Sequence, residues 1–86
     1  MDRSEYFGIL ADKTRLKIID YLQNGEKCAC EIVPFTGKSQ PNVSLHLKKM
    51  EEAGILSSRK DATRVLYKIR DKRVNEILQI LKQKTI

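Results

Sequence analysis

Two cysteines separated by one residue are the side chains best suited to bind a soft ion or to change oxidation state. Cys28 and Cys30 stand in the stretch CACEIV and are the only cysteines among 86 residues. A thiolate is both a nucleophile and a ligand for soft metals, and Lys27 beside the pair favours the thiolate form. Three interpretations stay open: a ligand site for a metalloid or metal, a thiol that senses oxidation, and two small residues at a helix start.

The spacing of the pair constrains a shared ligand. We expect CACEIV to form a short helix that Pro34 interrupts or restarts, followed by a turn at Thr36-Gly37. On an ideal helix, residues i and i+2 point about 200° apart, so two such thiols grip one atom only if the backbone unwinds. Ligand binding should therefore distort this segment and move the helix that follows the short stretch from Pro34 to Lys38.

The composition fits one small soluble domain spanning residues 1–86. Apolar residues make up 41% of the chain and charged residues 33%, too apolar for a disordered tail. The apolar runs are far shorter than the roughly 20 residues that span a bilayer, and the N-terminus MDRSEYF does not resemble a signal peptide. We therefore expect a cytoplasmic protein, and in that reducing compartment a structural disulfide is not expected.

Positive charge is concentrated in the second part of the chain. The net charge is +6, but residues 1–34 hold five basic and six acidic residues, whereas 35–86 hold twelve and five. This asymmetry favours a polyanion partner for the second part. No P-loop, GxGxxG or Cys-His-Asp set is present, so we expect no enzyme.

Two helices are predicted before the cysteines. Ser4 is the expected cap of a short helix that runs through Leu10. Asp12 is the expected cap of a second helix that ends at Asn24-Gly25, because apolar residues recur there at helical spacing. The apolar positions of the second helix are Leu16, Ile18, Ile19 and Leu22.

The stretch SQPNVSLHLKKMEEAG is the clearest helix. Ser39 or Gln40 caps it, Pro41 occupies the first turn, and Gly54 closes it. Its inward positions are Val43, Leu47 and Met50. Its outward positions are Pro41, Asn42, Leu45, Lys48 and Lys49, with Gln40, Ser44 and His46 on the flanks.

After Gly54 the apolar period changes from 3.6 to 2. ILSSRK and RVLYKI predict two strands in which Val65, Tyr67 and Ile69 alternate with Arg64, Leu66 and Lys68. The connection 61–63 lacks Asn-Gly or Asp-Gly, so we expect a longer, mobile tip. Asp71 then caps a last helix with an apolar stripe at Val74, Ile77, Leu78 and Leu81.

This order of elements predicts a mainly α fold with a β-hairpin wing, the winged helix-turn-helix. Its second motif helix lies in the major groove. The side-chain amides of Gln40 and Asn42 are suited to pair with adenine, and Leu45 is suited to contact a thymine methyl group. Six side chains suit phosphates: Ser44, Lys48, Lys49, Arg59, Lys60 and Arg64. Ser39 and His46 complete the expected DNA-binding set, His46 as a phosphate contact or a packing residue.

Two apolar faces exceed what so small a core can cover. The first helix offers Tyr6, Phe7 and Leu10, and the last helix offers Val74, Ile77, Leu78 and Leu81. We therefore expect a homodimer through the first and last helices.

LADKTRLKIIDYL, followed by SQPNVSLHLKKMEEAGIL and a basic hairpin, resembles the ArsR (ArsR/SmtB) family of metal-responsive repressors. The most specific part is the pattern S-Q-P-x-V-S-x-H-L from Ser39 to Leu47. The resemblance implies a homodimer that binds an imperfect palindrome in double-stranded DNA and leaves it when a metal ion or metalloid binds.

In the arsenic-sensing branch, a C-x-C lies on the helix before the recognition helix, and Cys28 and Cys30 match it. This implies arsenite, antimonite or another soft metal ion as inducer, with no required cofactor. The position of a third family thiol is Val33 here, so a third ligand must be a small-molecule thiol, a water-derived oxygen or nothing. The last helix lacks the Asp, His, His, Glu set of the zinc-sensing branch.

Two alternatives to a metal-responsive repressor remain. One is a thiol redox regulator that uses the same cysteines. The other is a winged-helix protein-interaction module without DNA binding, which the outward Leu45 favours.

Overall fold

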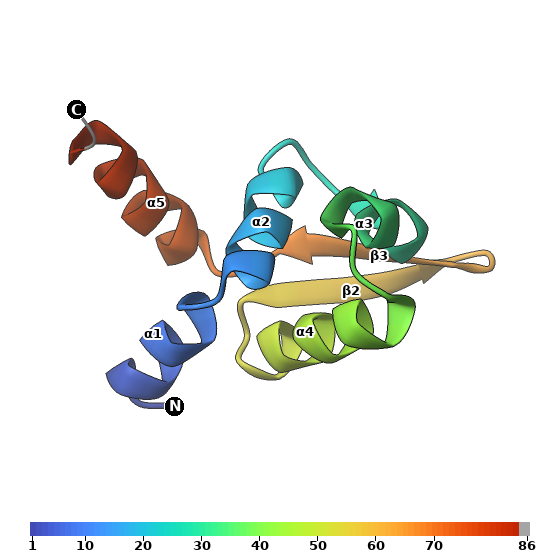
Figure 1. The fold of residues 1–86 in the computed structure, drawn as a ribbon, viewed down its shortest axis with the longest axis horizontal. Coiled ribbons are helices and arrows are strands. Elements are labelled where there is room, and N and C mark those ends of the chain that lie inside the picture. Colours follow the sequence, from blue (N-terminus) through green and yellow to red (C-terminus); the bar gives the residue numbers. More distant parts are fainter. Residues whose placement is uncertain (85–86) are drawn as a thin grey trace.

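The computed structural model describes residues 1–84 and contains five helices and a three-stranded sheet. The elements in order are α1 (Arg3–Leu10), α2 (Lys13–Leu22), β1 (Lys27–Cys28), α3 (Ala29–Thr36), α4 (Gln40–Glu52), β2 (Leu56–Asp61), β3 (Arg64–Ile69) and α5 (Lys72–Lys84). The predicted winged helix-turn-helix is confirmed: α3 and α4 form the motif, and β2 and β3 form the wing (Figure 1).

Side chains at the helix starts decide where the helices begin. Asp12 Oδ1 accepts a hydrogen bond from Arg15 N at 2.9 Å, and Ser39 Oγ accepts one from Asn42 N at 3.3 Å, as expected of caps. The prediction for α1 is wrong, because Asp2 and not Ser4 is its cap. Asp2 Oδ1 accepts from Glu5 N at 2.8 Å, and the hydroxyl of Ser4 donates to the same atom at 3.0 Å.

The cysteine stretch is only partly helical. Lys27–Cys28 form the short strand β1, which pairs antiparallel with β3, and α3 begins at Ala29. Pro34 lies inside α3 and neither interrupts nor restarts it, contrary to expectation. Gly37 ends α3 in the left-handed conformation with φ 72°, which a residue without Cβ adopts freely.

The wing is tighter than predicted. Asp61 pairs with Arg64 across a turn of two residues. Ala62 in this turn has φ 58°, a left-handed conformation that glycine more often adopts. The expectation of a longer tip is wrong because Ala62 takes up the left-handed backbone that this turn requires. In β3 the buried side chain is Leu66, while Val65, Tyr67 and Ile69 are half-buried.

The core lies between the helices and one face of the sheet. The predicted stripe of α4 is buried, and so are Ile18, Ile19 and Leu22 of α2, whereas Leu16 is half-buried. The buried residues that form one core cluster are Leu10, Ile18, Ile19, Leu22, Ile32, Val43, Leu47, Met50, Ile55, Leu56 and Val74.

The molecule is elongated, with extents of 40 × 29 × 21 Å. Helices α1 and α5 lie at one end and the tip of the wing lies at the other, with α2, α3 and α4 between them (Figure 1). Among residues 1–84, no helix has the length and apolar character needed to cross a bilayer.

Candidate functional site

Helix α4 turns a polar face to solvent. Val43, Leu47 and Met50 are at most 2% exposed and fix the side that meets the core. The exposed side chains Gln40, Asn42, Ser44, Leu45, Lys48 and Lys49 form the surface that we call the α4 outer face. Leu45 is 64% exposed. The α4 outer face therefore presents amide, hydroxyl and ammonium groups around one apolar side chain, the mixture that base edges, thymine methyls and phosphates require.

His46 is less accessible than the α4 outer face. It is half-buried, and its Nδ1 accepts a hydrogen bond from Arg15 Nε at 3.0 Å. Arg15 also donates through Nη1 to the backbone oxygen of Ile9 at 3.0 Å. Arg15 therefore ties α4, through His46, to the corner between α1 and α2. No local sequence signal indicates this contact, because its partners are 31 residues apart.

Two of the three predicted wing cations already have carboxylate partners. Arg59 donates from Nε and Nη2 to the two carboxylate oxygens of Glu26, each at 2.9 Å. This hydrogen bond lowers the pKa of Glu26, and Glu26 raises the pKa of Arg59, so both groups are charged. Arg64 pairs with Asp61 at 3.3 Å, and Lys60 is exposed.

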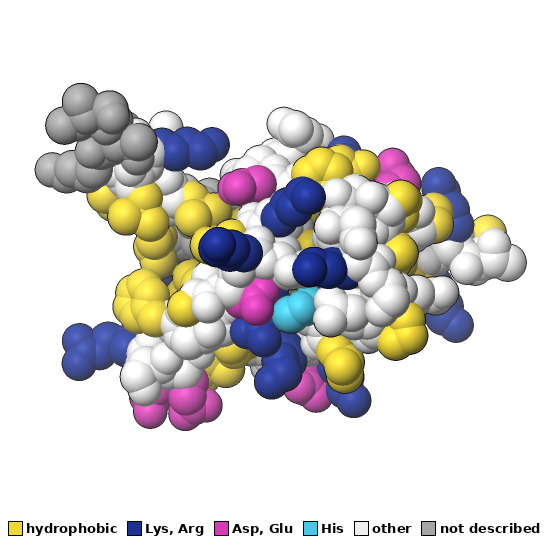
Figure 2. Space-filling model, in the orientation of Figure 1, with side chains coloured by type: hydrophobic (Ala, Val, Ile, Leu, Met, Phe, Trp, Pro, Cys, Tyr) yellow, Lys and Arg dark blue, Asp and Glu magenta, His cyan; other side chains and the backbone are white. Residues whose placement is uncertain are grey.

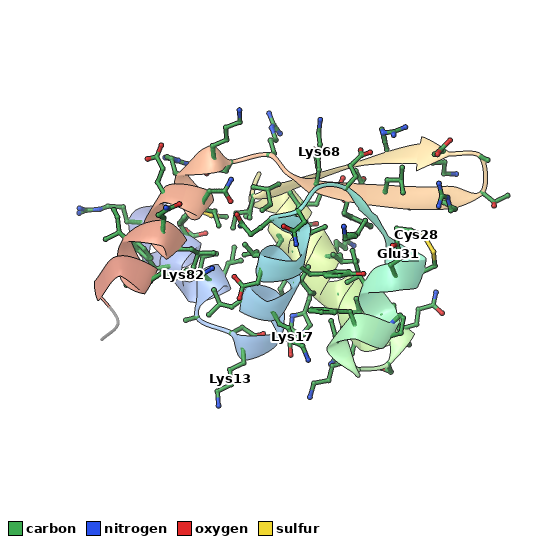
Figure 3. The ribbon with its side chains drawn as sticks, turned by 90° about the horizontal axis from the view of Figure 1, so that it is seen from above. Lys13, Lys17, Cys28, Glu31, Lys68 and Lys82 are labelled. Atoms are coloured by element: carbon green, nitrogen blue, oxygen red, sulfur yellow. A yellow bond between two sulfur atoms is a disulfide. The ribbon has the colours of Figure 1, made fainter. Side chains whose placement is uncertain are left out.

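The cysteines lie at the N-terminus of α3, and their sulfur atoms form a disulfide (Figure 3). Cys28 is the cap of α3 and has extended backbone, with φ −69° and ψ 145°. The expectation that the thiols point apart is therefore wrong: only Cys30 is helical, the Cα atoms are 5.0 Å apart, and the sulfurs meet without unwinding. The disulfide also contradicts the expectation that such a bridge is absent.

The two sulfurs differ in accessibility and hydrogen bonding. Cys28 is 2% exposed, whereas Cys30 is exposed. Cys28 Sγ accepts a hydrogen bond from Cys30 N at 3.1 Å, and Cys28 N donates to Glu31 Oε1 at 2.9 Å, which together form a capping box. The buried sulfur is thus part of the helix start, and the exposed sulfur faces outward.

Strand β1 connects the cysteine pair to the wing. Cys28 lies opposite Leu66 of β3, and Leu66 lies opposite Arg59 of β2. One row across the sheet therefore runs from the buried cysteine to the wing arginine that Glu26 holds. Cys28 is thus connected to the wing through the sheet, in addition to its connection through α3 to α4.

A hollow of about 330 Å³ separates α3 from the start of α4. Its lining residues are Ala29, Cys30, Val33, Pro34, Gln40, Ser44 and Leu47. The hollow brings Cys30 to the same surface depression as two residues of the α4 outer face, Gln40 and Ser44. This juxtaposition could not be derived from the sequence, since the helix crossing determines it.

An aromatic stack holds α3 against α2. The rings of Tyr21 and Phe35 are parallel within 8° with centroids 3.9 Å apart. Lys17 Nζ lies 5.3 Å from the centroid of Phe35, and Lys27 Nζ lies 5.3 Å from that of Tyr21. Stacking and cation–π contacts thus anchor the helix that carries Cys30.

The described residues supply no third metal donor. Within 1–84, no three His, Cys, Asp or Glu side chains gather as a metal site requires, and the position where the resemblance implies a third thiol is Val33. Two sulfurs in a disulfide do not bind a soft ion, because the ligand is the thiolate. The pair becomes a two-thiolate donor set only after reduction.

The predicted dimer surface is partly internal to the chain. Leu10 and Val74 are 7% and 0% exposed and belong to the core of their own chain. Phe7 is 52% exposed, Leu81 57%, and Ile80, which the predicted stripe omitted, 55%. Together with half-buried Ile77 and Leu78 they form the α1–α5 apolar patch, and Figure 2 shows hydrophobic side chains gathered over these helices.

A polar contact fixes α1 against the start of α5. Tyr6 Oη donates to Asp71 Oδ2 at 3.0 Å, and the Arg73 guanidinium lies 5.4 Å from the Tyr6 ring centroid. Burial and this hydrogen bond raise the pKa of Tyr6 to about 12. The hydrogen bond from Arg73 lowers the pKa of Asp71 to about 2. Tyr6 thus connects α1 to the start of α5, and its ring makes an edge contact with the ring of Phe7.

The middle of the chain matches a known protein family. Residues 12–58, which include α2, α3 and α4, match the model of the bacterial regulatory protein, arsR family. A homodimeric winged helix-turn-helix DNA-binding domain from Mycobacterium bovis has 26% sequence identity to the chain and a TM-score of 0.83. That match covers 94% of this chain and 78% of the other.

Three sequence relatives are regulators of transcription by name. A probable mercury resistance operon repressor from Streptomyces lividans is 36% identical over 90% of this chain and 62% of its own length. An uncharacterized HTH-type transcriptional regulator from Methanocaldococcus jannaschii is 40% identical over 91% of this chain and 89% of its own length. An arsenical resistance operon repressor from Staphylococcus aureus is 36% identical over 85% of this chain and 70% of its own length. The chain thus spans less than two thirds of the mercury repressor.

Proposed function

The chain belongs to the ArsR family of bacterial regulatory proteins, and we propose that it is a homodimeric transcriptional repressor that a soft metalloid or metal releases from DNA. The observation that carries the proposal is the α4 outer face, whose polar and basic side chains stand in solvent while the opposite side of the helix is buried. Such a helix in a helix-turn-helix enters the major groove, and the wing beside it reaches the backbone.

Side chains divide between reading bases and holding phosphates. Gln40 and Asn42, in the first turn of α4, read base edges, and Leu45 meets a thymine methyl. The phosphate contacts come from Ser39, Ser44, Lys48, Lys49, Lys60 and Arg64, with Arg59 once it leaves Glu26. His46 supports α4 through Arg15 and stands behind this surface.

The proposed inducer site is the reduced pair Cys28 and Cys30. Two thiolates favour arsenite or antimonite, and the names of the relatives, which include mercury and arsenical resistance, agree with a soft ion. Binding would pull on the cap of α3 and on the sheet row that leads to Arg59. Both elements that meet DNA are then displaced together.

The disulfide favours a second candidate, a repressor that responds to oxidation. In this case the dithiol and disulfide forms bind DNA with different affinity, and no ion is needed. A titration with DNA from the protein's own upstream region distinguishes the two. The chain is first reduced by a phosphine; one portion, kept reduced, is given each candidate ion, and another, freed of the phosphine, is given an oxidant. Release by an ion supports the first proposal, release only by the oxidant supports the second, and binding confined to very low salt contradicts both.

Base reading by Gln40 is testable by one substitution. Gln40→Ala should lose about 1–3 kcal/mol of preference for operator over random DNA, because a bidentate amide contact to adenine disappears. Arg64→Ala is the matched control and should weaken both DNAs alike, since a phosphate contact carries no sequence information. Fluorescence anisotropy with both DNAs measures the difference. Equal losses on the two DNAs for Gln40→Ala would refute base reading.

Glu26 is expected to restrain the wing. In the unsubstituted protein, Arg59 must leave Glu26 before it can contact a DNA phosphate. Glu26→Gln removes this ion pair and should therefore strengthen binding to operator and random DNA by up to about fivefold, which corresponds to the free energy of an exposed ion pair. The salt dependence of DNA binding by Glu26→Gln should become steeper, as expected for the release of about one more counterion. Glu76→Gln is the control, since it removes the same charge from an exposed position on α5. An unchanged affinity for Glu26→Gln would mean that Arg59 keeps its partner on DNA.

A further inference from the structure

We propose that Cys30 is a modification site for a low-molecular-weight thiol, which opens the disulfide and occupies the hollow between α3 and α4. The inference rests on the proposed DNA binding only for its regulatory consequence. The chemistry follows from the two unequal sulfurs, and the location follows from the hollow beside the exposed one.

Accessibility selects the sulfur that is attacked. Cys28 is 2% exposed and lies in the sheet opposite Leu66, whereas Cys30 is exposed and lines the hollow. Thiol–disulfide exchange requires the attacking thiolate to reach one sulfur in line with the other. Approach from solvent therefore leads to Cys30 Sγ.

Hydrogen bonding selects the sulfur that leaves. The attacking thiol gives up its proton, its thiolate forms a bond to Cys30 Sγ, and the bond between the two protein sulfurs breaks. Cys28 leaves as a thiolate and takes up a proton, so one disulfide replaces another without net oxidation. The leaving sulfur already accepts a hydrogen bond from Cys30 N at 3.1 Å at the N-terminus of α3, which stabilises its negative charge.

The hollow suits a thiol that carries amide or carboxylate groups. Its volume of about 330 Å³ is in the lower range of small-molecule sites. Gln40 and Ser44 offer hydrogen bonds on one wall, and Val33, Pro34 and Leu47 make the rest mainly apolar. A group on Cys30 Sγ thus lies against two residues that are proposed to contact DNA, so it should displace the DNA sterically.

Two measurements test this proposal, and the first needs no DNA. The disulfide form of the full chain is mixed with reduced glutathione, quenched by acid at intervals, and mapped by mass spectrometry of its peptides. The expected adduct is on Cys30, with a free thiol on Cys28. An adduct mainly on Cys28, or none at any time, would overturn the proposal.

The second measurement uses Cys28→Ser, which has no neighbouring thiol to expel the adduct and keeps an oxygen as helix cap. Oxidised glutathione should modify Cys30 in this variant, and operator affinity should fall about tenfold or more, as when a base contact is lost. Methyl methanethiosulfonate adds only a methylthio group to the same sulfur and should leave the affinity nearly unchanged. Cys30→Ser with oxidised glutathione is the matched control and should remain largely unmodified.

The outcomes separate this proposal from the proposed function. If glutathionylated Cys28→Ser binds the operator as tightly as the unmodified variant, the adduct does not cover the DNA surface and the regulatory inference is wrong. If neither form binds any DNA, the proposed repressor function fails, and the mapping experiment alone decides whether Cys30 is the modified sulfur.

Discussion

Glutamate in place of Leu78 is expected to convert a dimer of this chain into single chains. Leu78 is half-buried in the α1–α5 apolar patch, between Ile77 and the exposed Leu81. A carboxylate buried in such an interface loses its hydration without gaining a partner. Because burying a leucine side chain is worth about 1.5–3 kcal/mol, the dimer dissociation constant should rise at least about tenfold. Sedimentation at micromolar concentration measures it.

The same substitution should weaken operator binding more than any change on the DNA surface. A dimer places its second α4 near the second half-site at a high effective concentration, an advantage of about 10²–10⁴ in overall affinity. Single chains lose this gain in affinity for a palindrome but keep their affinity for one half-site. Anisotropy with full and half operators separates the two effects.

Controls must exclude unfolding, because Leu78 also packs against the core. Ile80→Glu places the same charge in the patch on a side chain that is 55% exposed, so it should dissociate the dimer with little loss of thermal stability. Gln79→Glu adds a charge to an exposed polar position of α5 and should leave the dimer intact. A single-chain mass for the unsubstituted protein, or dimers that persist in Ile80→Glu, would contradict the proposed interface.

Local patterns in the sequence were sufficient to predict α4. A stripe of period 3.6, a serine cap and a proline in the first turn all act within a few residues, and each is found where expected. The inward side, and with it the α4 outer face, follows from the same stripe. The winged helix-turn-helix could therefore be predicted from the order of elements.

The parts that the sequence did not indicate depend on distant partners. Strand β1 has two residues and exists because β3 pairs with it, so nothing in CACEIV itself separates a strand from a helix. The extended backbone of Cys28 that follows from this pairing brings the sulfurs together. Glu26 and Arg59 are 33 residues apart, and neither residue type alone predicts that the wing cation is already held.

Loss of either sulfur should strongly weaken the release of DNA by arsenite. Cys28→Ser and Cys30→Ser are each expected to bind the operator with near-normal affinity, since neither side chain belongs to the α4 outer face and serine preserves the cap of α3. The arsenite concentration needed for release should rise at least about a hundredfold, because even groups that only support a metal ligand are worth about 10–100-fold in affinity. Anisotropy titrations with phosphine-reduced protein measure both quantities.

Adding a third thiol should have the opposite effect if the metalloid sits between these residues. Val33 lines the same hollow as Cys30 and follows it by one helical turn, so Val33→Cys places a soft donor beside the pair and should lower the arsenite concentration needed for release. Release by a metal cation should also strengthen as pH rises, because each bond to a thiolate displaces a proton, whereas arsenite gives up a hydroxide that leaves with the thiol proton as water and should show little pH dependence. If Cys28→Ser/Cys30→Ser released DNA at the same arsenite concentration as the unsubstituted protein, the ion would bind elsewhere, and the cysteines would act in the start of α3 or in thiol exchange alone.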